Sequence, residues 1–257
     1  MSGMQALFMN YGQTLSVVDS ADFDGTNDYM TRGAGLTGAA DSKLGIISFW
    51  CRIDAGDGTT RLLQSSATTV GGATQGFRVF ANTTNGIEFL GTNAAASSIL
   101  SITTSTNSVL AGATWRHVLC SFDMSDTAKR HLYLNDVSDL NVATYTNDTI
   151  DYTFADWSIG ARPDGAVKVD GCFAEFYLAF GQYLDFSIIA NRRRFISANG
   201  KPVWLGTDGA IPTGTAPLVY QRVADGAAVA TFATNLGTGG NFSITGTLTA
   251  GSTSPSD

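Results

Sequence analysis

Apolar and polar side chains alternate along most of this chain, and the 3.6-residue repeat of an amphipathic helix is almost absent. Because successive side chains of a strand point to opposite faces, the alternation predicts an all-β protein. Residues 44–53 are apolar on both faces. This run therefore predicts a strand that is covered on both sides, at the centre of a packed sheet.

Turn-rich runs join the other predicted strands into hairpins. One hairpin pairs residues 75–81 with residues 87–90, and the turn-forming residues 82–86 connect them. A second hairpin pairs residues 115–124 with residues 129–135. The regular spacing of short strands and polar turns is typical of a two-sheet antiparallel sandwich.

The pattern changes in the last third of the chain. A long strand is predicted at residues 169–180, where Gly171 marks a β-bulge. One short helix follows, with Ser187 as its N-cap and apolar residues at helical spacing up to Ile196. Four of the five prolines fall after residue 200. This final part is predicted to be an extended segment with short strands at residues 218–221, 229–232 and 242–245.

Composition and charge restrict the classes of partner that the protein is expected to bind. Charged residues make up only 14% of the 257 residues, the net charge is −7 and the pI is about 4.7. An acidic chain is repelled by phosphate, so nucleic acid is not an expected partner. The only basic run, Arg192 to Arg194, is interpreted as a solvated or salt-bridged helix face.

Cysteine usage and segment hydropathy add further expectations. Cys51, Cys120 and Cys172 lie among apolar residues in predicted strands, without zinc-type spacing, so we expect three buried thiols. The first residues lack the basic and apolar regions of a signal peptide, and no apolar run has the length of a membrane span. We therefore expect synthesis in a cytoplasm and no membrane insertion.

Catalytic residues are not predicted. A glycoside hydrolase needs two carboxyl groups that flank one bond. Glu88 and Glu175 are the only glutamates, and neither has an acidic residue two positions away. His117 is interpreted as a hydrogen-bonded structural residue within a strand, and His131 opens the next strand. We therefore expect a protein that is not an enzyme.

Oxygen-rich clusters make calcium the one cofactor to consider, although none is expected. The clusters are Asp22, Asp24, Asn27 and Asp28; Asp54 and Asp57; and Asn147, Asp148 and Asp151. The alternative interpretation is that these are turn residues that bind their own backbone, and no metal site is assigned.

Carbohydrate-binding sites combine an exposed aromatic ring with polar loop residues. The sequence offers one such group: Tyr145, Asp148, Asp151, Tyr152 and Trp157. The alternative is that the aromatic residues cap the core or lie in a subunit contact.

Six motifs occur in the order found in laminin-G-like domains. They are residues 23–29 (FDGTNDY), 47–50 (ISFW), 115–118 (WRHV) with 122–123 (FD), 132–136 (LYLND), 158–160 (SIG) and 171–177 (GCFAEFY). The chain thus resembles the laminin-G and concanavalin-A-like jelly-roll family over roughly residues 17–190. Two positions depart from the family pattern: Ala174 replaces a frequent acidic residue, and Asp136 replaces a turn glycine. The first departure weakens the transfer of an acidic binding role to that strand.

The resemblance implies three parts: an N-terminal arm (1–16), a laminin-G-like sandwich (17–190) and a short helix with an extended C-terminal segment (191–257) that packs on the sandwich or on a neighbouring subunit. The last part also resembles structural proteins of tailed bacteriophages, at residues 195–202 (FISANGKP), 205–209 (LGTDG), 212–214 (PTG) and 235–242 (NLGTGGNF).

Three functional hypotheses follow. The first is a non-enzymatic virion protein made in the host bacterium, a capsid decoration or tail-associated jelly roll. Its partners would be other virion proteins and copies of itself, with a trimer the first choice. The second is a carbohydrate-recognition module that binds host-surface glycans. The third, a glycan hydrolase, is weakened by the scarcity of carboxylates.

Overall fold

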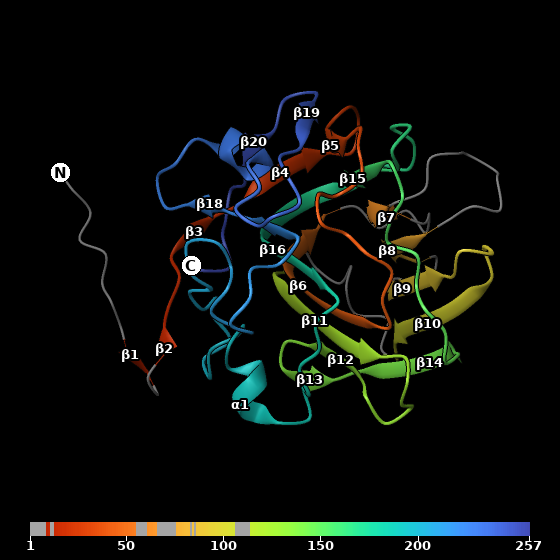
Figure 1. Ribbon diagram of the computed structural model, residues 1–257. Helices are drawn as coiled ribbons and strands as arrows, with labels where there is room; N and C mark the ends of the chain where they lie inside the picture. Colours follow the sequence, from red (N-terminus) through yellow and green to blue (C-terminus); the bar gives the residue numbers. More distant parts are fainter. Residues whose placement is uncertain are drawn as a thin grey trace.

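Antiparallel strands are the dominant regular structure of the protein (Figure 1). The computed structural model describes residues 9–10, 13–54, 61–65, 76–82, 84, 86–105 and 114–257. Within them, helical structure is limited to α1 (Ile189–Arg192) and the 3₁₀ helix η1 (Val229–Ala233). The predicted all-β fold is confirmed.

Two large sheets pack face to face as a jelly-roll sandwich. The first has the order β14 (Leu140–Tyr145), β10 (Ser98–Thr104), β9 (Ile87–Thr92), β8 (Phe77–Ala81), β7 (Arg61–Ser65), β15 (Trp157–Ile159), β5 (Tyr29–Arg32), β19 (Ser243–Thr245). The second has the order β13 (Val137–Ser138), β12 (Arg130–Leu134), β11 (Arg116–Asp123), β6 (Leu44–Ile53), β16 (Asp170–Phe180), β4 (Ala21–Asp24), β20 (Thr249–Ala250). Both predicted hairpins are present as β8–β9 and β11–β12.

Three short pairings lie beside these sheets. They are β1 (Met9–Asn10) with β2 (Gln13–Thr14), β3 (Val18–Asp19) with β18 (Val223–Ala224), and β17 (Val219–Gln221) with β16. C-terminal strands thus extend the sandwich, since β17, β19 and β20 pair with β16, β5 and β4.

The central position predicted for β6 is confirmed. This strand lies between β11 and β16. Ile47 and Phe49 point into the main core between the sheets, where the Phe49 ring meets those of Phe173 and Phe176 on β16. Burying each such side chain removes apolar surface from water and contributes about 1.5–3 kcal/mol.

The chain after β16 covers the outer face of the second sheet. Phe186, Phe195 and Leu205 pack there against Ile46 and Tyr177. A neighbouring cluster joins Ile196 to Trp50. The central strands β11, β6 and β16 are therefore buried on both faces, and the last third of the chain forms an additional layer.

The bulge in β16 lies four residues beyond its predicted position. The register of β16 with β6 shifts between Ala174 and Tyr177, and Glu175 has a φ of 47°. The prediction at Gly171 was wrong, although a side chain there would meet the Arg52 carbonyl oxygen at 2.2 Å. Gly171 is needed for close strand packing rather than for the bulge.

The helix is shorter than the sequence pattern indicates. Ser187 is not its N-cap, because its N–H and hydroxyl both bind the Asp185 carboxylate, at 2.8 and 2.6 Å. The strand predicted at residues 229–232 was also wrong: this run forms η1, whose Phe232 is buried in the main core. The strands predicted at 218–221 and 242–245 are confirmed as β17 and β19.

The arginine run has a structural role, as predicted. Arg192 and Arg193 bind the Asp136 carboxylate at 2.5 and 2.7 Å. Asp136 and Asn135 have φ values of 66° and 50°, as a two-residue hairpin turn requires. The ion pairs therefore hold an aspartate in a backbone conformation that glycine adopts more easily.

Candidate functional site

The aromatic residues predicted to bind a glycan are not arranged for that purpose. Tyr152 is 0% exposed and stacks on Phe180 at a ring distance of 3.9 Å. Trp157 is 1% exposed, and its indole N–H donates to the Phe154 carbonyl oxygen at 3.0 Å. Neither ring has a face in solvent, so a sugar cannot stack on either. The alternative interpretation, that these aromatics belong to the core, describes them correctly.

The remaining residues of that predicted group bind protein partners. The Tyr145 hydroxyl donates to the Lys129 carbonyl oxygen at 3.1 Å. Asp148 accepts a hydrogen bond from the Asn93 side chain at 2.6 Å, and Asp151 accepts two from Thr153. These carboxylates stabilise their own loops.

The oxygen-rich clusters that were considered for calcium also bind protein partners. Asp24 accepts backbone N–H groups from Thr26, Asn27 and Asp28, and these bonds hold the pKa of its carboxyl below the usual value. Asp28 is buried and accepts the N–H of Thr247 at 2.7 Å. In the third cluster, Asn147 accepts the Lys43 ammonium at 2.9 Å. Asp57 lies outside the described residues.

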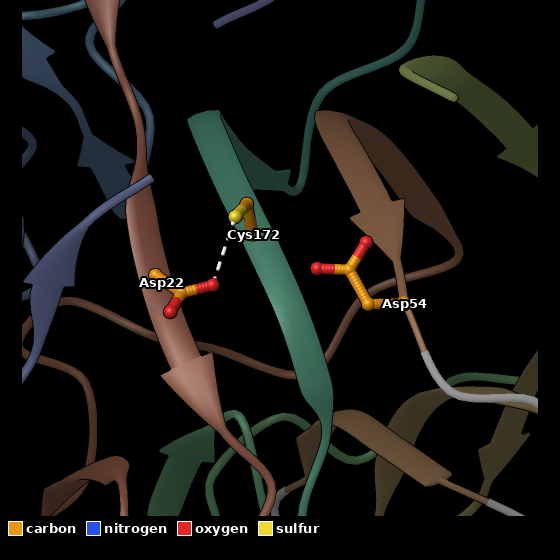
Figure 2. A group of neighbouring side chains, drawn as sticks. All are labelled: Asp22, Asp54 and Cys172. Carbon is orange, nitrogen blue, oxygen red and sulfur yellow. Dashed lines mark hydrogen bonds between the residues drawn. The ribbon is translucent and has the colours of Figure 1, made fainter. Parts of the chain in front are cut away.

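Among the residues that the structure describes, one group of potential metal ligands does form, from Asp22, Asp54 and Cys172 on neighbouring chain segments (Figure 2). Their ligand atoms lie within 4.8 Å of one another. However, the Cys172 thiol donates to Asp22 at 3.0 Å, and Arg52 binds both oxygens of Asp54 at 2.7 Å. Burial and the nearby Asp22 raise the pKa of the thiol, so it stays protonated.

This group joins the C-terminal segment to the sandwich. The Arg52 guanidinium also donates to the hydroxyls of Ser252 and Thr253, at 3.3 and 2.8 Å. The Ser20 hydroxyl donates to the Thr253 carbonyl oxygen at 2.8 Å. The group is therefore a polar clamp that fixes the chain just before its last residues.

The two glutamates lie on opposite sides of the sandwich. Glu88 is on β9 between the core residues Ile87 and Phe89, so it points away from the core of the first sheet. Glu175 is buried on the second sheet, where it accepts hydrogen bonds from Ser16 and Tyr220 at 3.0 and 2.8 Å. Since packed sheets are about 10 Å apart, this pair does not flank a common bond.

A serine and a histidine approach each other inside the second sheet. The His117 Nε2 atom lies 2.9 Å from the Ser48 hydroxyl, and both residues are buried. Burial lowers the pKa of His117 to about 3, so the ring is neutral at ordinary pH. Trp50 covers it at a ring distance of 4.7 Å. This geometry confirms the structural role predicted for His117.

A groove at the end of the second sheet combines an aromatic ring that is not fully buried with polar side chains, which the predicted site does not. Its volume is about 330 Å³, and its lining is Trp50, Trp115, Asn135, Ile196, Gly200, Lys201, Ser254, Pro255 and Asp257. Trp115 is half-buried and packs on the cluster that contains Trp50 and Ile196. Its indole N–H donates to the Thr253 hydroxyl at 3.1 Å, which fixes the ring.

Polar groups line the same groove as this indole. Lys201 binds the main-chain oxygen of Asp257. One carboxylate oxygen of Asp257 accepts the N–H of Ser254 at 2.7 Å. Asn135 is exposed, and its side-chain oxygen accepts the N–H of His117 at 2.8 Å. The groove therefore combines an aromatic wall with an ammonium, a carboxylate and an amide.

The sequence analysis missed this groove. Trp115 was interpreted only as part of a strand motif, and Lys201 and Asp257 are remote from it in sequence. A tryptophan directly before a strand was the one available signal, because side chains at strand ends reach the edge of a sandwich.

The fold defines a two-sheet jelly roll of the lectin-like class, and the sequence agrees. The chain belongs to the concanavalin A-like lectin/glucanase superfamily, whose Laminin_G_3 model matches residues 24–179. A comparison with curated proteins finds no match. Among the residues that the structure describes, no helix is long and apolar enough to span a bilayer.

Solved structures resemble this chain at low sequence identity. A Bacteroides ovatus ATCC 8483 protein with a suggested role in carbohydrate binding has a TM-score of 0.60 and 14% identity, over 93% of this chain and 60% of its own. The chain thus spans less than two thirds of that protein. A Limulus polyphemus pentraxin has a TM-score of 0.45 and 11% identity, over 66% of this chain and 78% of its own. The mouse laminin alpha1 chain has a TM-score of 0.45 and 13% identity, over 71% of this chain and 47% of its own.

Proposed function

We propose that this protein is a non-enzymatic, lectin-like module that binds carbohydrate. The observation that carries the proposal is the groove beside Trp115, where a fixed aromatic ring lies among polar side chains on a fold of the lectin class. Sugar recognition uses such a combination, because C–H groups of the ring pack on an aromatic face while the hydroxyls need polar partners.

The proposal includes no catalytic step. A retaining glycosidase needs carboxyl groups about 5 Å apart, and an inverting one needs about 6.5–9.5 Å. Glu88 and Glu175 lie on opposite sides of the sandwich, and Glu175 is 3% exposed. The buried Ser48–His117 pair is also unsuitable for a nucleophile, since both side chains are closed to substrate.

A glycan array tests the carbohydrate-binding proposal. The full chain should bind a small set of saccharides saturably, and binding should survive a chelator because no resident cofactor is proposed. The absence of binding to every saccharide, with and without added calcium, would contradict the proposal. Release of reducing ends from a bound glycan would contradict its non-enzymatic part.

We also propose that this module belongs to a bacteriophage particle, as a capsid decoration or a tail-associated subunit. The observation in favour is the resemblance of residues 195–202 and 235–242 to tailed-phage structural proteins. Its partners there would be other virion proteins and copies of itself, with a trimer as the first choice, and it would be made in the cytoplasm of the bacterial host.

Immunogold electron microscopy of particles from the source lysate tests the virion proposal. Label on heads would support a decoration protein, and label at tail ends would support a receptor-binding subunit. Unlabelled particles, with the protein monomeric in solution, would contradict the virion role and leave the carbohydrate-binding proposal unaffected.

A further inference from the structure

We infer that the groove beside Trp115 binds a neutral saccharide, with a sugar ring on the indole and two adjacent hydroxyls held between Asp257 and Lys201. This inference rests on the proposed function and adds to it a ligand class and the side chains that hold the ligand. The groove volume of about 330 Å³ is at the lower end for small-ligand sites, which suits a short saccharide.

The aromatic wall is preformed. Trp115 is held at its indole N–H by Thr253 and packs against the cluster of Trp50 and Ile196. Because the ring is already ordered, binding does not have to immobilise it, and more of the stacking energy contributes to affinity. A platform of this kind orients a sugar before any hydrogen bond forms.

The polar side chains of the groove have free hydrogen-bond donors and acceptors for two sugar hydroxyls. Lys201 uses one of its three ammonium donors on the Asp257 main chain, so two donors remain for sugar oxygens. The Asp257 carboxylate uses Oδ2 for Ser254, which leaves Oδ1 to accept from a hydroxyl. Asn135 uses its oxygen on His117 and keeps its amide donors. Each hydroxyl can thus both donate and accept.

Charge favours a neutral ligand over an anionic one. The ammonium of Lys201 is balanced by the carboxylate of Asp257 within the same groove. The whole chain carries a net charge of −7, which repels sulfated and uronic-acid polymers at long range. An acidic glycan would approach a negative protein and find no uncompensated cation in this groove.

The groove is a feature of this chain beyond the part that matches the family model. That match ends at residue 179, whereas Ile196, Gly200, Lys201, Ser254, Pro255 and Asp257 all follow it. The matched part supplies Trp50, Trp115 and Asn135, and the later segments close the site around them.

Titration of the full chain with the strongest neutral saccharide from the array tests this inference. Trp115→Ala should weaken binding by at least about tenfold, and Asp257→Ala by several-fold, since removal of a central aromatic anchor has the larger effect. Trp204→Ala is the matched control, because Trp204 is another half-buried tryptophan, stacked under Arg222 and not part of the groove. The control should bind like the unmodified protein.

The outcomes separate the inference from the proposed function. If no glycan binds the unmodified protein, the proposed function fails and the inference fails with it. If a glycan binds and both groove variants bind equally well, the inference is overturned while the function stands. Binding of sulfated or uronic glycans alone would overturn the ligand class. Asp257 is exposed, so Asp257→Ala gives a decisive result even if Trp115→Ala does not fold.

Discussion

Two tryptophans of this protein lie in opposite environments, although each stands at the start of a strand of the sandwich. Trp157 begins β15 and is buried in the main core, where the centre of its ring lies 5.6 Å from the centre of the Phe180 ring. Trp115 directly precedes β11 and stays half-exposed in a groove. The local sequence thus determines that an aromatic residue lies at a strand of the sandwich. Segments distant in sequence determine whether a face of its ring is exposed to solvent.

The region around Trp157 is sealed by its own sheet neighbours. Its strand pairs with β5 and β7, and its side chain joins the main core. The region around Trp115 is shaped instead by residues 196–201 and 254–257, which border the ring without covering it. One region therefore belongs to the packed core, and the other is the open groove for which we propose saccharide binding.

The largest expected effect comes from Trp157→Ala. Removal of a fully buried indole should lower the free energy of unfolding by about 3–5 kcal/mol, because both transfer energy and a cavity contribute. Urea unfolding followed by circular dichroism measures the change. A loss below about 1 kcal/mol would contradict the core role and return Trp157 to the candidates for ligand binding.

The next largest effect is a pH dependence of the free energy of unfolding that arises from His117. Its folded pKa of about 3 lies below the ordinary value of 6.5, so the unfolded chain binds more protons between these two values. The free energy of unfolding should therefore fall as pH falls through this window, by about 2 kcal/mol from this group at pH 5. His117→Gln should remove that part of the pH dependence.

The prediction for His117 is tested by measuring the free energy of unfolding against pH for the unmodified protein and for His117→Gln, and comparing the slopes of the two curves. Burial raises the pKa of Glu175, so its protonation stabilises the fold as pH falls and opposes the histidine effect. This contribution is the same in the two proteins and cancels in the difference between them. Parallel stability–pH curves for His117→Gln and the unmodified protein would show that the ring is not buried in neutral form.

The sequence predicted the regular parts of the fold and not the site. The two-faced apolar pattern located β6, and the turn-rich runs located both hairpins, because local periodicity reports directly on a strand's surroundings. The bulge at Glu175 could not be predicted from the sequence, because no local sequence pattern marks a glutamate with a positive φ. The groove forms because segments remote in sequence, at Lys201 and Asp257, line the same hollow as Trp115, and no local pattern encodes this arrangement.

A smaller effect is expected when the polar clamp is broken by Arg52→Met. The loss of ion pairing with Asp54 should cost no more than about 1 kcal/mol in overall stability, because the pair is partly exposed. Hydrogen exchange should report a clearer change at Gly251, whose N–H donates to the Ser20 carbonyl oxygen at 3.1 Å. Unchanged exchange there would mean that the strand pairing of β20 holds the segment without the clamp.

The smallest effect is expected for Trp115→Phe, which keeps an aromatic face and removes only the indole donor. The lost hydrogen bond to Thr253 has a net worth of about 0.5–1.5 kcal/mol, and water can replace it at this half-exposed position, so the change should lie at the low end. Urea unfolding measures it, with Thr253→Val as the reciprocal variant. If the double variant loses the sum of the two single losses, the bond does not hold the ring, and Trp115 is kept in place by its packing on Trp50 and Ile196 alone.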